Sequence, residues 1–138
     1  MAVMMMVSNG NSDTTILAAH GQIKKLETEQ TVAQVVNTES IVRDYFSDIP
    51  VMVQVARCES TFRHTLADGT VLRGYVDNRD TGVMQINTYY HGDTAATMNL
   101  DLEDIYDNMA YARYLYETQG TQPWSASRPC WGRTLASL

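Results

Sequence analysis

The chain has 138 residues, which is enough for one domain with a single core and too few for two sizeable domains. Apolar residues make up 44% and charged residues 19%, a composition that excludes an intrinsically disordered protein. Ten basic and sixteen acidic residues give a net charge of -6, which argues against nucleic acid as a partner because a polyphosphate backbone would be repelled.

Residues 1–45 are expected to form a flexible N-terminal segment and a helical arm without chemistry of their own. Residues 8–15 are small and polar and predict a flexible lead-in. From Ile16 to about Thr38, apolar residues recur mostly at steps of three or four, which predicts an amphipathic helix weakened at Gly21. The repeat is too short and broken for a coiled coil, so we expect a spacer helix and a monomer.

No apolar run in the chain approaches the roughly 20 residues that span a bilayer. The arm would therefore tether the protein to a membrane only through a segment that precedes it. Spacer and tether remain alternatives for residues 1–45.

Residues 46–138 predict a mostly helical domain with one small sheet, which is an α+β fold. A helix over residues 39–46 leads into a second helix, which begins after Asp48 as a natural N-cap and ends near Phe62. Pro50 is tolerated in the first turn of this helix, where no hydrogen bond needs its missing N–H.

Turn-forming residues follow the second helix. Asp68 and Gly69 lie between two extended, partly apolar stretches of residues 66–72, which is a strong signal for a β-hairpin. A second turn cluster covers residues 77–82. Helices are then expected near residues 86–90, 94–98 and 102–119. Gly120 is suited to end the last of them.

Glu59 interrupts an otherwise apolar helix face. Met52, Val55 and Ala56 precede it by three to seven residues and so lie on the same face. A carboxyl held against hydrocarbon has a raised pKa, and it can stay protonated near neutral pH and act as a general acid. The alternative is an ordinary surface ion pair with Arg63, four residues further on.

An acidic turn residue, Asp80, is followed by the amide side chains of Gln85 and Asn87. Amides offer both donors and acceptors, which suits the hydroxyl and acetamido groups of a sugar chain. The alternative is that Asp80 caps a turn, while Gln85 and Asn87 cap the next helix.

Trp124 follows the long helix in the segment Gly120–Ser127. An indole packs against a carboxyl and keeps water from it, or it stacks on a sugar face. The alternative is that Trp124 is simply a core residue.

The chain has two cysteines, Cys58 and Cys130. A disulfide between them would indicate an oxidising compartment, and two buried thiols are the alternative. The sequence contains no glycine-rich phosphate loop, Cys-x-x-Cys pair or His-Glu-x-x-His helix, and its three histidines are scattered. We therefore expect neither a cofactor nor a metal site.

In their order and spacing, four segments resemble the lysozyme superfamily, both the C-type lysozymes and the soluble-lytic-transglycosylase domain. In that superfamily a glutamate at the end of a helix precedes a hairpin and a Gly-x-x-Gln-Ile motif. The segments that carry the resemblance lie within residues 46–131. They are Cys58-Glu59-Ser60-Thr61-Phe62, the stretch from Asp80 to Tyr90 with Gly82-Val83-Met84-Gln85-Ile86-Asn87, Asn108-Met109-Ala110-Tyr111-Ala112-Arg113-Tyr114, and Gly120 to Cys130.

The resemblance implies a lysozyme-like catalytic domain over residues 46–138, with a small β-hairpin beside the active-site cleft. Glu59 matches the glutamate that protonates the glycosidic oxygen, and Asp80 resembles the second carboxylate of C-type lysozymes, which lytic transglycosylases generally lack. The resemblance places the substrate-binding residues in the saccharide cleft, namely Gln85, Asn87, Tyr111 and Trp124. It also implies a disulfide between Cys58 and Cys130.

The implied function is a muramidase, a secreted or cell-envelope glycosidase that cleaves the β-1,4 bond between N-acetylmuramic acid and N-acetylglucosamine in peptidoglycan glycan strands. One alternative is a lytic transglycosylase, which gives 1,6-anhydro products, and another is a non-catalytic glycan-binding module. The chain lacks the other disulfides of C-type lysozymes. Its acidity also gives no attraction to an anionic wall, which favours controlled wall remodelling over bulk killing.

Overall fold

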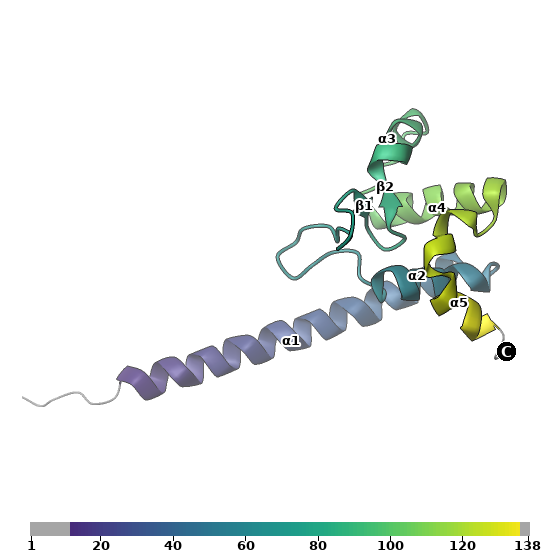
Figure 1. Ribbon diagram of the computed structural model, residues 1–138. Coiled ribbons are helices and arrows are strands. Elements are labelled where there is room, and N and C mark those ends of the chain that lie inside the picture. The colour runs from purple at the N-terminus through teal and green to yellow at the C-terminus, as the bar shows by residue number, and fades with distance from the viewer. Residues whose placement is uncertain (1–11, 136–138) are drawn as a thin grey trace, which may run out of the picture.

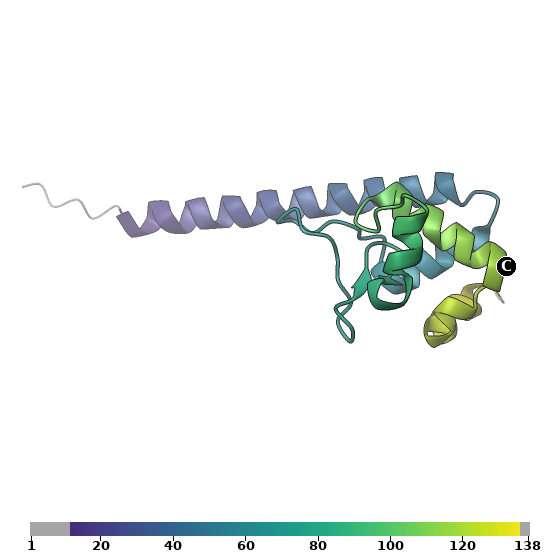
Figure 2. The ribbon, with the colours of Figure 1, turned by 90° about the horizontal axis from the view of Figure 1, so that it is seen from above.

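The protein is predominantly helical and has one small antiparallel sheet, as predicted for an α+β fold. The structure, a computed structural model, describes residues 12–135, and the side chains of residues 16–133. One long helix projects from a body formed by the other elements (Figure 1). The perpendicular view shows the same helix extending well beyond that body (Figure 2). None of the described helices combines the length and apolar character needed to cross a bilayer.

The projecting helix, α1 (Ser12–Tyr45), is a single helix of 34 residues. It begins inside the stretch 8–15 that was predicted to be a flexible lead-in. That prediction is wrong for residues 12–15, which are helical, and residues 8–11 lie outside the described part of the chain.

The two helices predicted over residues 16–38 and 39–46 are also continuous in α1. No glycine or proline follows Gly21 within the helix, so nothing in the backbone favours a break. Across the predicted junction, the guanidinium of Arg43 pairs with the carboxylate of Glu39 one turn earlier, at 2.6 Å. Such pairs one turn apart support a continuous helix.

The two ends of α1 lie in different environments. Leu17 and Leu26 near the start are 72% and 64% exposed, whereas Val42 and Phe46 at the end are fully buried. The last turns of α1 therefore belong to the core of the body, and the first turns form a free-standing arm.

Helix α2 (Pro50–Ser60) begins with proline in its first turn, as predicted, but its N-cap residue is Ile49 rather than Asp48. The Asp48 carboxylate instead accepts two hydrogen bonds from the Arg113 guanidinium, at 2.8 and 2.9 Å. A bidentate charged pair is stronger than a single cap bond, which explains why the cap prediction is wrong.

Helix α2 ends at Ser60, two residues before the predicted end. Thr61 and Phe62 adopt left-handed backbone angles, with φ of 50° and 56°. This reversal stops the helix directly after Glu59 and Ser60 and returns the Phe62 side chain to the core, where it is buried.

The sheet lies at the second turn cluster and not at the predicted hairpin. Residues 66–72 form a turn with a single bridge between Thr65 and Val71, and they are largely exposed. The two strands are β1 (Asp80–Thr81) and β2 (Ile86–Asn87), with Asp80 opposite Asn87. The turn signal at Asp68 and Gly69 was correct, but the flanks pair only through the single Thr65–Val71 bridge and do not form a regular ladder.

The remaining elements follow β2 in chain order. Helix α3 (Thr88–Thr97) replaces the two short helices predicted near 86–90 and 94–98 and continues through Gly92. Helix α4 (Ile105–Gln119) begins three residues later than predicted, because the Asp104 side chain accepts from the N–H groups of Tyr106 and Asp107. Gly120 ends α4 as predicted. A 3₁₀ helix, η1 (Gln122–Ser127), and a final helix, α5 (Arg128–Leu135), were not predicted.

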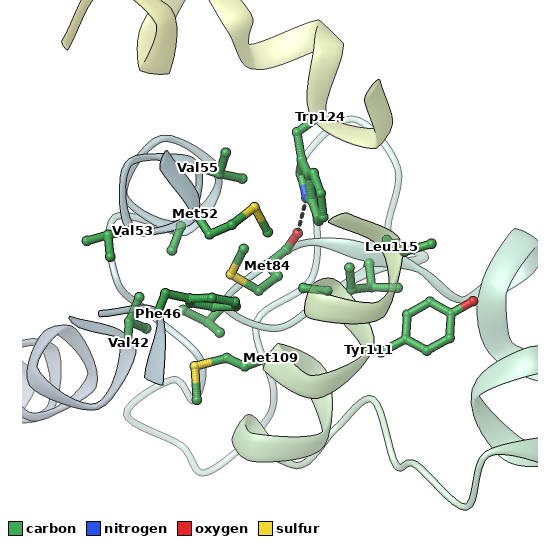
Figure 3. Close-up of a cluster of buried hydrophobic side chains, with 14 of the residues drawn as sticks. Val42, Phe46, Met52, Val53, Val55, Met84, Met109, Tyr111, Leu115 and Trp124 are labelled. Atoms are coloured by element: carbon green, nitrogen blue, oxygen red, sulfur yellow. Dashed lines mark hydrogen bonds between the residues drawn. The ribbon is translucent and has the colours of Figure 1, made fainter. Parts of the chain in front are cut away.

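The core fills the space between α1, α2, α4 and the loop that joins the two strands. Figure 3 shows the sulfur-containing side chains of Met52, Met84 and Met109 beside Phe46. The indole of Trp124 lies above Met84 and donates a hydrogen bond from Nε1 to its carbonyl oxygen, at 2.9 Å. The segment after α4 is therefore fixed to the strand loop by both packing and a hydrogen bond.

A buried polar network holds the loop between the strands. Asn108, which is fully buried, accepts from the Met84 N–H at 3.0 Å and donates to the carbonyls of Thr81 and Leu102. A Cβ at Gly82, whose φ is 72°, would lie 2.7 Å from the Asn108 amide nitrogen. Glycine is therefore required at this position both by its backbone angle and by the close approach of Asn108.

The other side of this loop rests on His64. Its Nδ1 accepts from the Val83 N–H at 3.1 Å, and its Nε2 donates to the carbonyl of Glu103 at 2.8 Å. Burial lowers the pKa of His64, which favours the neutral ring that this arrangement of one donor and one acceptor requires.

Replacing Asn108 by alanine is expected to destabilise the protein by about 2–4 kcal/mol, because one buried N–H and two carbonyls lose their partner. Urea unfolding of the variant and the parent measures this difference. Asn78→Ala, at an exposed loop position, is the control and should change stability by less than about 0.5 kcal/mol. Equal midpoints for Asn108→Ala and the parent would contradict the role given to this network.

Candidate active site

A cleft of about 340 Å³ separates the strands and α3 from the segment after α4. Its lining contains two carboxylates, three amides, an imidazole and two aromatic rings. The residues that line it are Glu59, Asp80, Gln85, Ile86, Asn87, Tyr90, His91, Leu115, Gln119, Pro123, Trp124 and Ala126. Five of the predicted site residues are thus brought together, namely Glu59, Asp80, Gln85, Asn87 and Trp124.

Glu59 lies in the last turn of α2 and is partly buried. Burial raises the pKa of its carboxyl, a hydrogen bond from Ser127 lowers it, and the negative charge of Asp80 raises it. The net direction is upward, so the carboxyl keeps its proton at a higher pH than an exposed glutamate would.

The ion pair between Glu59 and Arg63, which the spacing allowed, does not form among the described residues. Arg63 Nε instead donates to the carbonyl of Ser60 at 3.2 Å and to Thr61 Oγ1 at 3.1 Å. The partner of Glu59 is Ser127, whose hydroxyl lies 2.5 Å from Oε1 of the carboxyl. Among the described residues, the interactions that shift the pKa of Glu59 come from Ser127 and Asp80 and include no cation, which suits a general acid.

The sheet register pairs Asp80 with Asn87, and both residues line the cleft. The Asn87 amide nitrogen donates to Asp80 Oδ1 at 2.8 Å and to Asp77 Oδ2 at 3.1 Å. Its oxygen accepts from the Tyr89 N–H and so caps α3. Asn87 therefore caps the helix, as the alternative interpretation predicts, and the same side chain also lines the cleft.

The turn itself is capped by Asp77 rather than by Asp80. The Asp77 carboxylate accepts from the backbone N–H and the guanidinium of Arg79. Hydrogen bonds from Arg79 hold the pKa of Asp77 well below its ordinary value. Asp80 does not have this role, and it is among the residues that line the cleft.

Gln85 lies in the loop that Asn108 and His64 support. Its backbone is left-handed, with φ of 50°, and its amide nitrogen donates to the Gly82 carbonyl at 2.8 Å. It does not cap α3. The bond to Gly82 holds the side chain against its own loop at the cleft wall.

Trp124 is both a core residue and a cleft residue. It is 3% exposed, and its ring fills the space beside Met84. Its carbonyl oxygen accepts from the Trp131 indole at 3.0 Å. The two interpretations of Trp124 are therefore not exclusive, because the edge that lines the cleft belongs to a ring that the core holds in place.

Tyr111 is the predicted site residue that lies apart from the others. It is buried in α4, and the described residues that line the cleft do not include it. Its hydroxyl lies 3.1 Å from Nδ1 of His91, which does line the cleft. Tyr111 thus contacts the cleft through His91.

The disulfide between Cys58 and Cys130 is present, as predicted. It joins α2 to α5 across 72 residues of sequence. Cys58 directly precedes Glu59, and Cys130 follows Ser127 by three residues. The covalent link therefore holds together the two segments that supply the carboxyl and its hydrogen-bond partner.

No specific sequence signal identified Ser127 as the partner of Glu59, or Tyr90 and His91 as cleft residues. Serine and tyrosine at exposed helix ends are common, and the Ser127 contact joins residues 68 positions apart. Among the described residues, no group of three His, Cys, Asp or Glu side chains is placed to hold a metal ion. What the cleft offers is one partly buried acid, a second carboxylate and several amide and hydroxyl groups.

The chain matches no family model, and comparisons with curated proteins and with solved structures found no match.

Proposed function

We propose that this protein is a glycosidase with a lysozyme-like domain, which cleaves the β-1,4 bond between N-acetylmuramic acid and N-acetylglucosamine in peptidoglycan. The observation that carries the proposal is the partly buried Glu59 carboxyl, which shares a cleft lined by amides and an indole with Asp80, whose charge raises the Glu59 pKa. A pair of carboxyl groups in one cleft is what glycoside hydrolysis uses.

In the proposed mechanism, Glu59 donates its proton to the glycosidic oxygen as the bond to the anomeric carbon breaks. Its raised pKa keeps that proton available at a higher pH than an exposed glutamate would. Asp80 stabilises the positive charge that develops on the sugar ring, either directly or by directing a water molecule. Gln85 and Asn87 hydrogen-bond the sugar substituents, and Trp124 keeps bulk water from the acid.

A second outcome is the anhydro product of a lytic transglycosylase. The observation in its favour is that Asp80 already accepts a hydrogen bond from Asn87 and pairs with it in the sheet, which is a structural role in itself. In that case a substituent of the muramic acid would capture the cation in place of water. We favour hydrolysis because Asp80 also lines the cleft that contains Glu59.

The test is digestion of purified peptidoglycan at mildly acidic pH, followed by mass spectrometry of the soluble fragments. We expect fragments with reducing N-acetylmuramic acid ends. Fragments lighter by one water per cleaved bond would show that the reaction is that of a lytic transglycosylase and not hydrolysis. Binding to the insoluble wall without release of fragments would refute both reactions and indicate a binding module.

The same digestion tests Asp80 directly. Asp80→Asn is expected to slow hydrolysis by roughly 10²-fold or more, because an amide cannot stabilise the cation as a carboxylate does. Asp77→Asn is the matched control, since Asp77 accepts from the same Asn87 amide but does not line the cleft. Equal losses in the two variants would assign Asp80 a structural role only.

We place the protein outside the cytoplasm, in the cell envelope or in the surrounding medium. Its disulfide supports this placement, because such bonds form and persist in oxidising compartments. The proposed substrate lies in the same place.

A further inference from the structure

The Ser127 hydroxyl lies between two acceptors. Its oxygen is 2.5 Å from Oε1 of Glu59 and 3.1 Å from the carbonyl oxygen of Trp124. A hydroxyl carries one hydrogen and two lone pairs, so it can donate to only one of these groups at a time. The direction of the bonds must therefore depend on whether Glu59 carries its proton.

When Glu59 is ionised, the hydroxyl hydrogen of Ser127 points to the carboxylate. When Glu59 is protonated, its own O–H can donate to Ser127 Oγ, and the serine hydrogen turns to the Trp124 carbonyl. That carbonyl is fixed, because it also accepts from the Trp131 indole at 3.0 Å. Serine thus has a complete set of hydrogen bonds in both states of the acid, which a residue that can only donate or only accept would not have.

The neighbouring structure holds Ser127 and Glu59 in fixed positions relative to each other. Ser127 ends η1, and Glu59 lies in the last turn of α2. The disulfide between Cys58 and Cys130 joins the two segments next to this contact. The Trp124 indole anchors the start of the same segment to the Met84 carbonyl.

We propose that Ser127 is a positioning residue that holds the Glu59 carboxyl in one orientation through both the loss and the return of its proton. This inference rests on the proposed function, since it concerns the acid that would protonate the glycosidic oxygen. An acid that must leave and regain a proton in each cycle benefits from a partner that reverses its hydrogen bond without moving.

Other titratable groups also face the cleft, and they bear on the pH dependence. They are Asp80 from β1 and Tyr90 and His91 from α3. Asp80 raises the pKa of Glu59, whereas the hydrogen bond from Ser127 lowers it. Removing the serine hydroxyl while leaving the other groups in place should therefore shift the titration of Glu59 to higher pH.

The test compares Ser127→Ala with Ser127→Thr, which keeps the hydroxyl, and with Ser125→Ala, an exposed position in the same 3₁₀ helix. We expect Ser127→Ala to lower kcat by roughly 10- to 100-fold with KM within about threefold, since misplacement of a catalytic group costs up to ~10² in rate. The basic limb of its kcat/KM profile should move to higher pH. Ser127→Thr should recover most of kcat, and Ser125→Ala should match the parent.

An unchanged kcat and an unshifted basic limb in Ser127→Ala would overturn the proposal. So would equal losses in the alanine and threonine variants without a shift of the limb, because a purely structural role predicts that result.

A measurement without turnover separates this proposal from the proposed function. Carbon-13 NMR follows the titration of the Glu59 carboxyl in the parent and in Ser127→Ala, and we expect a higher midpoint in the variant. If the parent cleaves no peptidoglycan but the midpoint shifts, the proposed function fails and the contact between Ser127 and Glu59 stands. If the parent cleaves peptidoglycan and the two midpoints coincide, the proposal about Ser127 fails.

Discussion

Glu59→Gln is expected to lower the rate of peptidoglycan cleavage by about 10²–10⁴-fold, because an amide cannot donate the proton that the leaving oxygen needs. Release of soluble muropeptides at saturating substrate measures the loss. Glu117→Gln makes the same chemical change at an exposed position of α4 and should leave the rate within about twofold of the parent. A residual rate within about tenfold of the parent in Glu59→Gln would contradict the role of Glu59 as the general acid.

The same variant should not be less stable than the parent at neutral pH. The folded-state pKa of Glu59 is raised above its unfolded value, so its contribution to stability is present below the unfolded pKa. That contribution is lost as the pH rises through the folded pKa, where the partly buried carboxyl ionises. Glutamine carries no such cost and still accepts from Ser127. Thermal unfolding should therefore show a gain for the variant at pH 7 that shrinks toward pH 4.

Removing the disulfide is expected to cost about 4 kcal/mol of stability, because the bond closes a loop between residues 72 positions apart. Cys58→Ser combined with Cys130→Ser, unfolded in urea beside the oxidised parent, measures this cost. Cleavage should fall as well, since α5 and Ser127 lose their covalent link to α2.

Reductant provides the control for this prediction. It should bring the parent to the stability of the double variant and leave the double variant unchanged. Alkylation before and after reduction, read as a mass shift, reports the state of the two thiols. A double variant that unfolds within 1 kcal/mol of the parent would show that the remaining contacts hold α5 in place.

Local sequence patterns predicted the parts of the site that depend on local structure. The position of Glu59 on an apolar helix face followed from residue spacing, and the stop at Gly120 followed from helix-ending chemistry. Patterns failed where a distant residue decides the outcome. Asp48 is a good N-cap residue in isolation, but Arg113, 65 residues away, takes its carboxylate. The Asp68–Gly69 turn was recognised, but its sequence does not say whether a packing surface exists for its flanks.

The candidate site shows the same division. Asn87 caps a helix and Trp124 belongs to the core, as their alternative interpretations predict, and both side chains also line the cleft. Ser127 could not be assigned from the sequence, since its partner Glu59 is 68 positions away. Tyr111 was expected in the cleft from the resemblance alone, and it contacts that space through His91.

The hydrogen bond from the Trp124 indole to the Met84 carbonyl joins the segment after α4 to the loop between the strands. These two parts of the chain form two walls of the cleft. Hydrogen bonds to Asn108 and His64 hold the loop between the strands, and the disulfide joins the segment after α4 to α2. Moving these two walls apart would break the bond between Trp124 and Met84, or else the hydrogen bonds and the disulfide that hold each wall. The cleft therefore has a fixed width, and a glycan strand, as the proposed substrate, would have to fit that width.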